Sequence, residues 1–186
     1  MPLPDDDDSI CGACCLNKPD VDRVITAYRF EEPLRTLLHA FKYREGLYLT
    51  SLLTNLMLHA AIDTSNLQCL IPIPLHPKRL QERGFNQAAI LAMRLSRILK
   101  VPYNLTQCKK IINTIPQAGL SASLRKTNLK NAFQAPSLPY QHVTLIDDIL
   151  TTGNTANELA RTLKQQGVKQ VDVWCCARVT PKIRVR

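Results

Sequence analysis

The residues best suited to chemistry lie between Val143 and Thr155, in the order V-T-L-I-D-D-I-L-T-T-G-N-T. An apolar run that predicts a buried strand leads to two adjacent carboxylates, Asp147 and Asp148. Small residues then precede a helical pattern: Thr151, Thr152, Gly153, Asn154 and Thr155. Free N–H groups at a helix start, the helix dipole and threonine hydroxyls suit a phosphate, and Gly153 leaves room for it. The two carboxylates suit ribose hydroxyls or a ligand-borne Mg²⁺, so the segment predicts a sugar-phosphate site.

Positive charge is concentrated in the middle of the chain. The protein has 186 residues, with 24 Lys and Arg against 15 Asp and Glu. Residues 76–130 contain 11 basic side chains and a single acidic one, Glu82. Such a segment suits an anionic partner, either a phosphorylated small molecule or nucleic acid; a solvated basic face without a partner is the alternative.

The elements that must position these residues alternate between strand and helix. Strands are predicted at 21–30 (a strand or hairpin arm), 69–73, 102–108, 142–146 and 169–177. Helices are predicted at 33–41, 47–62, 84–99 and 154–166. The proline-rich exit that carries Lys78 and Arg79 is expected to be a turn, Asp147–Gly153 a loop, and 109–136 a long loop or flap. This alternation predicts an α/β fold with a mostly parallel sheet.

Segment 143–155 resembles the signature with which type I phosphoribosyltransferases bind 5-phosphoribosyl-1-pyrophosphate (PRPP). Two further motifs fit: R-G-F-N-Q at residues 83–87, and Q-x-x-L-x-x-x-x-R-x-x-N-x-x-x-A-F at residues 117–133. Together the three look like the ComF family, the competence protein F group of bacterial phosphoribosyltransferase-like proteins. The resemblance covers about residues 10–178 of the chain.

The resemblance implies a type I phosphoribosyltransferase fold for residues 21–186, with a hood at about 109–136 that closes over the ligand. By this resemblance, Asp147 and Asp148 are expected to be the catalytic pair, and Mg²⁺ is expected to bind together with PRPP. The PRPP-binding set is then Thr151, Thr152, Gly153, Asn154, Thr155, Lys78 and Arg79. The candidate nucleic-acid contacts are Arg83, Lys109, Lys110, Arg125, Lys126 and Lys130. Aromatic side chains for base stacking are few, the candidates being Phe85, Tyr103, Phe133 and Tyr140.

Three functions are compatible with these residues. The first is a PRPP-binding protein of natural competence, which handles incoming single-stranded DNA beside helicase-type or recombination proteins, as the family implies. The second is an active transferase, in which an unidentified nitrogen acceptor attacks PRPP and releases pyrophosphate. The third is a scaffold for a helicase-type partner, with a ligand site that no longer works. The fold alone does not decide among them.

The first twenty residues form a separate Cys- and Asp-rich piece. Cys11 and Cys14 make one C-x-x-C knuckle, whereas a closed zinc site needs four ligands. The family element usually has an earlier knuckle, so the piece is interpreted as a remnant, and Zn²⁺ is expected only if that knuckle exists. Four cysteines beyond this piece lie in apolar, strand-like surroundings and are expected to be buried thiols: Cys69, Cys108, Cys175 and Cys176.

The composition favours a cytoplasmic protein. No stretch approaches the ~20 apolar residues needed to span a bilayer. The run Asp5–Asp8 stands where a secretory signal would need basic and apolar residues. We therefore expect no membrane insertion.

Overall fold

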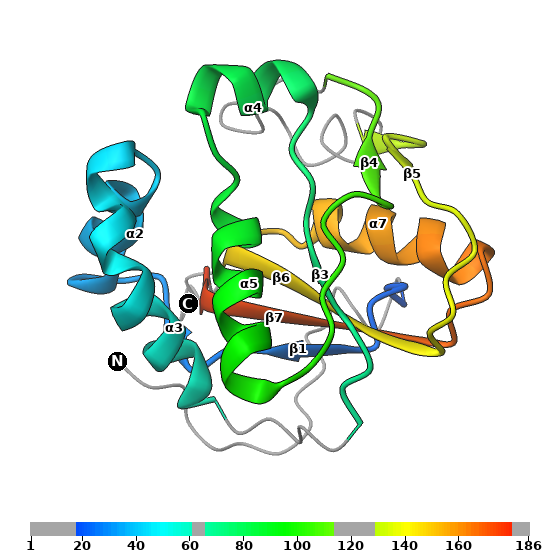
Figure 1. The fold of residues 1–186 in the computed structure, drawn as a ribbon, viewed down its shortest axis with the longest axis horizontal. Coiled ribbons are helices and arrows are strands. Elements are labelled where there is room, and N and C mark those ends of the chain that lie inside the picture. The colour runs from blue at the N-terminus through cyan, green and yellow to red at the C-terminus, as the bar shows by residue number, and fades with distance from the viewer. Residues whose placement is uncertain (1–17, 61–65, 114–128, 180–186) are drawn as a thin grey trace, which may run out of the picture.

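The fold is built around one parallel sheet. A computed structural model describes residues 18–60, 66–113 and 129–179. The strands follow the order β1–β7–β6–β3, and β2 pairs with β7 beyond the end of β1 (Figure 1). Their bounds are β1 Arg23–Ile25, β2 Tyr28–Arg29, β3 Leu70–Pro72, β6 His142–Leu150 and β7 Gln170–Arg178. A separate antiparallel pair joins β4 (Lys109–Lys110) to β5 (Phe133–Gln134). The predicted α/β fold with a mostly parallel sheet is confirmed.

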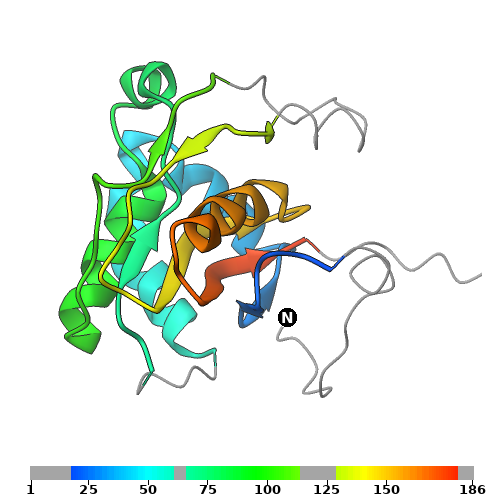
Figure 2. The ribbon, with the colours of Figure 1, turned by 90° about the vertical axis from the view of Figure 1, so that its right-hand side faces the viewer.

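Helices cover both faces of the sheet. One face carries α2 (Leu34–Phe41), the 3₁₀ helix η1 (Arg44–Leu49), α3 (Thr50–Leu58) and α5 (Gln87–Leu99). Helix α7 (Asn154–Gln165) covers the other, so that the sheet lies between two helical layers in Figure 2. The short helix α4 (Pro77–Arg83) lies beyond the start of α5, at the top of Figure 1.

Each face of the sheet has its own apolar core. Strands β6 and β7 send alternate side chains to the two cores, as the two-residue repeat of a strand requires. Ile146 and Trp174 enter the core beneath α2, α3 and α5, whereas Leu145 and Val173 enter the core beneath α7. All four side chains are fully buried. Burial on both faces explains why these strands are nearly continuous apolar runs in the sequence.

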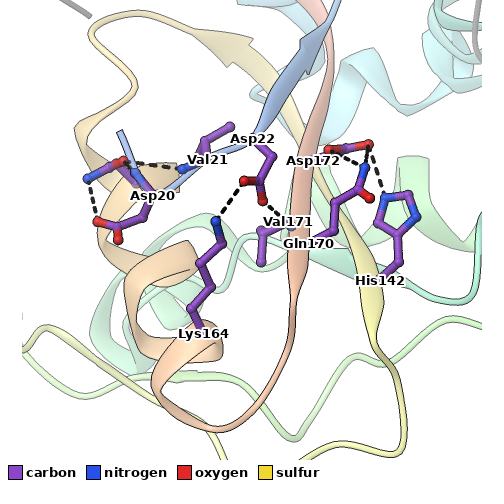
Figure 3. Close-up of polar contacts among 9 residues, drawn as sticks. Asp20, Val21, Asp22, His142, Lys164, Gln170, Val171 and Asp172 are labelled. Atoms are coloured by element: carbon purple, nitrogen blue, oxygen red, sulfur yellow. Dashed lines mark hydrogen bonds and ion pairs between the residues drawn. The ribbon is translucent and has the colours of Figure 1, made fainter. Parts of the chain in front are cut away.

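Polar contacts tie the first described residues to the edge of the sheet where β6 and β7 begin. Figure 3 shows Asp22 between two donors: Lys164 Nζ donates to Asp22 Oδ1 over 2.7 Å, and the Val171 N–H donates to Oδ2 over 2.8 Å. In the same view, His142 Nε2 lies 3.0 Å from the buried carboxylate of Asp172. These contacts hold β1 in register with β7 at this edge.

The strand predictions need three corrections. Residues 21–30 form β1 and β2, both parallel to β7, and not a hairpin arm. Residues 102–108 do not form a strand: Tyr103 makes one isolated bridge to Leu70, after which the Asn104 side chain accepts from the Thr106 N–H and turns the backbone. Strand β6 continues past Ile146 to Leu150, because β7 keeps pairing with it to the end.

Helix starts also differ from the predictions. Residues 77–83 are helical where a turn was expected, because Pro77 occupies the first helical position, where its missing N–H costs nothing. The third helix begins at Thr50, after η1, and α5 begins at Gln87, where the Asn86 side chain caps it by accepting from the Ala88 N–H. The helices predicted from Pro33 and Asn154 are confirmed.

No helix within the described ranges is both long enough and apolar enough to span a membrane.

Two neighbouring leucines of α3 provide a matched test of this packing. Leu53 is fully buried in the core with Trp174, whereas Leu52 is 43% exposed. We predict that Leu53→Ala lowers the free energy of unfolding by about 2–5 kcal/mol through the cavity it leaves. Leu52→Ala should change it by about 0.5 kcal/mol or less. Urea unfolding followed by the fluorescence of Trp174, the single tryptophan, measures both, and equal losses would contradict this packing.

Candidate functional site

The two acids lie on the central strand near its carboxyl end. Asp147 and Asp148 belong to β6, where Asp147 pairs in register with Cys175 of β7. This corrects the prediction that they begin a loop. Each carboxylate accepts from the next backbone N–H: Asp148 N donates to Asp147 Oδ1, and Ile149 N donates to Asp148 Oδ1, both over 2.9 Å. Both side chains are half-buried, so the acids are partly accessible at the carboxyl end of the sheet.

The environment of Asp147 resists its ionisation. Burial raises the pKa of Asp147 well above its ordinary 3.8, and the neighbouring charge of Asp148 raises it further. The hydrogen bond from the Asp148 N–H and the positive charge of Lys42 act in the opposite direction. A pair of acids held together in this way favours a cation or hydroxyl donors as ligands, which fits the predicted role toward Mg²⁺ or ribose hydroxyls.

The loop after β6 leads directly into α7. Thr151 and Thr152 are exposed, and Gly153 occupies the cap position of the helix with φ +75°. A Cβ on Gly153 would meet only the Leu150 side chain, 4.0 Å away, so the protein around it leaves room for a side chain. Glycine is favoured here because the backbone is left-handed. Gly153 makes no side-chain cap hydrogen bond to α7, and the positive end of a helix dipole favours an anion at this position.

The second predicted group of PRPP contacts lies on α4. Lys78 is exposed and Arg79 is half-buried, with Arg79 Nη1 4.0 Å from Glu82 Oε2. His76 caps this helix by accepting from the Lys78 N–H over 3.3 Å, which gives that histidine a structural role. Both cations therefore stand on a helical turn that follows the carboxyl end of β3.

Helix α4 and strand β4 bring two basic side chains together. Burial lowers the pKa of the half-buried Lys110, and the positive charge of Arg79 lowers it further. The Lys110 ammonium also lies 5.8 Å from the centre of the Phe133 ring. Arg79 was predicted to contact PRPP and Lys110 nucleic acid, yet the structure places them in one electrostatic neighbourhood. Positive charges that act on one another in a half-buried setting favour an anionic ligand.

Sequence reasoning missed Lys42 and Gln87. Gln87 is a buried amide: its Nε2 donates to the Lys42 carbonyl, and its Oε1 accepts from Arg83 Nη1, both over 3.3 Å. Arg83 of α4, Gln87 of α5 and Lys42 after α2 are thereby joined, and the charge of Lys42 acts on Asp147. Gln87 lay within the R-G-F-N-Q motif, but nothing local to Lys42 in the sequence relates it to acids about a hundred positions away.

The remaining predicted cations divide by location. Lys109 and Lys130 are exposed, near the two ends of the hood segment. Arg125 and Lys126 lie outside the described residues, as do Cys11 and Cys14, so their predicted roles stay predictions. Within the described part of the chain, no cluster of three or more His, Cys, Asp or Glu could hold a metal ion.

Buried thiols were predicted and are confirmed. The four described cysteines are free and buried. Burial raises the pKa of the Cys69 thiol to about 11 and that of the other three to about 12: Cys108, Cys175 and Cys176. Such thiols are poor nucleophiles, so their role is packing.

The aromatic side chains predicted to stack with bases differ in how exposed they are. Phe133 is buried in the core beneath α7, with 5% of its surface exposed. Phe85 and Tyr140 are half-buried. Tyr103 is 44% exposed, but it lies in the bridge beside β3.

The chain is similar to proteins of known families. A family model described as phosphoribosyl transferase domain matches residues 86–182. Competence protein F of Haemophilus influenzae is 36% identical over 178 residues, which are 90% of this chain and 78% of that protein. DNA utilization protein YhgH of Escherichia coli K12 is 36% identical over 176 residues, 90% of this chain and 77% of that protein. Competence protein ComFC of Bacillus subtilis is 36% identical over 99 residues, 53% of this chain and 39% of that protein.

Among solved structures, the chain aligns with a purine phosphoribosyltransferase from Pyrococcus horikoshii. That alignment has a TM-score of 0.38 and 15% identity, and it covers 86% of this chain and 83% of the other. It adds nothing to the family matches.

The raised pKa of Asp147 predicts a pH-dependent cost to folding. Because the unfolded chain releases this proton more easily, the free energy of unfolding contributed by Asp147 falls as pH rises above about 4 toward the raised folded pKa. Asp147→Asn removes the charge and keeps the shape. We expect this variant to unfold with a higher free energy than wild type at neutral pH, and to lose part of the pH dependence.

Urea unfolding at several pH values measures the effect. The matched control is Glu31→Gln, which removes an exposed acid and should leave the pH dependence as in wild type. The prediction would be contradicted by an Asp147→Asn variant that is less stable than wild type at neutral pH and whose free energy of unfolding depends on pH as in wild type. Such a result would show that the folded protein favours the charge at this position.

Proposed function

The chain belongs to the ComF family of competence-related, phosphoribosyltransferase-like proteins, and from that membership we propose that it binds PRPP with Mg²⁺ at the carboxyl end of its sheet. We propose further that this binding serves the cell's handling of incoming single-stranded DNA. The observation that carries the ligand proposal is the arrangement at the end of β6. Two half-buried acids, a threonine loop and the start of α7 follow one another there.

Each part of that arrangement has a counterpart in the ligand. The loop N–H groups, with Thr151 and Thr152, would hold the 5-phosphate. Asp147 and Asp148 would bind the ribose hydroxyls. Their carboxylates also suit Mg²⁺, which when bound would neutralise charge on the diphosphate and on its departing pyrophosphate.

The cations of α4 complete the proposed site on the diphosphate side. Lys78 and Arg79 would bind the diphosphate oxygens, and Lys110 adds a charge beside Arg79. A cationic surrounding of this kind stabilises the negative charge that grows on a departing pyrophosphate. We therefore place the diphosphate beneath α4 and the 5-phosphate at the start of α7.

Transfer to an acceptor is the second candidate function. The raised pKa of Asp147 favours it, because strongly shifted acids beside a binding site are often tuned for chemistry. Pyrophosphate release that depends on an added nucleobase or amine would support transfer, whereas no release with any nucleobase or amine would leave PRPP as a bound ligand.

The DNA role rests on relatives and on charge. The relatives carry the names competence protein F and DNA utilization protein. The exposed cations Lys78, Lys109 and Lys130 are suited to contacts with a phosphate backbone, which need no base recognition. Helicase-type or recombination proteins of competence are the partners we propose for this step.

Isothermal titration with PRPP and Mg²⁺ tests the ligand proposal. Wild-type protein should bind with a micromolar dissociation constant. The double variant Asp147→Ala/Asp148→Ala should bind at least about tenfold more weakly, since it loses the hydrogen bonds of two charged groups.

A second pair of adjacent acids supplies the control. Glu31 and Glu32 are exposed at the start of α2, and the double variant Glu31→Ala/Glu32→Ala should bind PRPP as wild type does. Absence of binding by folded wild-type protein would overturn the proposal and favour the scaffold function.

A further inference from the structure

Two tyrosines of the η1 segment project from the surface. Tyr43 is 70% exposed and Tyr48 is 77% exposed, the highest values among the large apolar and aromatic side chains of the described residues. Leu47 and Leu52 next to them are 39% and 43% exposed. By contrast, Phe41 and Trp174 are fully buried, and Tyr103, at 44%, is the next most exposed Phe, Tyr or Trp ring among the described residues. Exposure of two rings within six positions creates an apolar surface that calls for an explanation.

The backbone under these rings is held firmly. Gly46 stands between them, and a Cβ on this glycine would lie 2.1 Å from the Ala40 carbonyl oxygen, so the turn is packed directly against α2. The Gly46 N–H donates to the Tyr43 carbonyl over 2.9 Å. Leu49 and Leu53, buried in the core, anchor the segment that follows. The two rings are therefore presented on a support that needs little ordering when a partner binds.

Positive charge lies on one side of this support. Lys42 directly precedes Tyr43, and the Lys42 carbonyl accepts from Gln87, whose other end accepts from Arg83 of α4. These contacts bring Arg83 of α4 close to Lys42, and Tyr43 directly follows Lys42 in the chain. An anionic chain that contacts these cations would bring its next groups onto the tyrosines.

We propose that Tyr43 and Tyr48, here called the tyrosine platform, stack with unpaired bases of single-stranded DNA whose phosphates contact Arg83 and Lys42. Aromatic rings beside cationic side chains are the usual means of binding a single strand without reading its sequence. A duplex offers no free base faces and is bound more weakly by such a surface. The inference rests on the proposed DNA role, and it assigns base stacking to these two tyrosines instead of to the aromatic side chains that the sequence suggested.

Fluorescence anisotropy with a labelled oligothymidine tests the platform. Loss of one stacked base should weaken binding by about 5- to 150-fold, so Tyr43→Ala and Tyr48→Ala are each expected to raise the dissociation constant by that factor. Tyr43→Phe and Tyr48→Phe keep the ring and should bind nearly as wild type does. Ile98→Ala removes an exposed apolar side chain of α5 and should leave the affinity unchanged.

Three readouts separate this inference from the proposed ligand site and from misfolding. Platform variants should keep the wild-type melting temperature, the wild-type affinity for PRPP with Mg²⁺ and the wild-type oligomeric state. Alanine variants that bind the oligonucleotide as wild type does would overturn the platform, as would phenylalanine variants as weak as the alanine ones. Wild-type protein that binds PRPP but no single strand would overturn it while leaving the ligand site intact. A change of oligomeric state in the alanine variants would show that the rings bind protein instead.

Discussion

The long parallel pairing between β6 and β7 is the interaction on which the rest of the molecule depends. It runs from His142 opposite Gln170 to Leu150 opposite Arg178, and it separates the core beneath α7 from the core beneath α5. The same pairing carries Asp147 and Asp148 to the end of the sheet and fixes where the following loop enters α7. In open α/β sheets, ligands bind at the carboxyl ends of the strands, which is where this pairing places the acids.

Electrostatic conflict at that edge links stability to function. Asp147 is held next to Asp148 in a half-buried position that raises its pKa, and Lys42 offsets only part of the cost. Arg79 and Lys110 repeat the pattern with positive charge. We propose that acids at one place and cations at another make the folded protein complementary to a ligand that brings its own metal and its own anionic groups. Binding of such a ligand would reduce the repulsion between the acids and the repulsion between the cations, both of which remain in the free protein.

The parts of this account that the sequence predicts are those with local causes. The strands at 69–73, 142–146 and 169–177 are apolar runs buried on both faces, and α7 shows the helical repeat followed by Gly167. The candidate site at 147–155 was inferred from residue types in one continuous segment, and its role in binding stays a prediction. The predictions that were wrong concern features that depend on contacts between distant residues or on a helix cap.

Four cases illustrate that limit. The acids remain in the strand only because β7 pairs beside them, and propensity alone would end the strand earlier. Helix α4 needs His76 as its cap and Pro77 at its first position, in a stretch whose prolines favour a turn. The charge of Lys42 acts on Asp147, and the Lys42 backbone carbonyl accepts from Gln87, 45 positions away. The exposure of Tyr43 likewise depends on how η1 packs against α2, which no local pattern encodes.

The most direct test of the central claim is amide hydrogen exchange of the protein with and without PRPP and Mg²⁺. The account predicts protection at two places on one side of the molecule, residues 147–156 and residues 77–83, because the ligand would bridge the end of β6 and α4. Amides at the opposite edge, near His142 and Gln170, should exchange as before. Protection confined to that opposite edge, or no protection at saturating ligand, would contradict the claim that the carboxyl end of the sheet is the binding site.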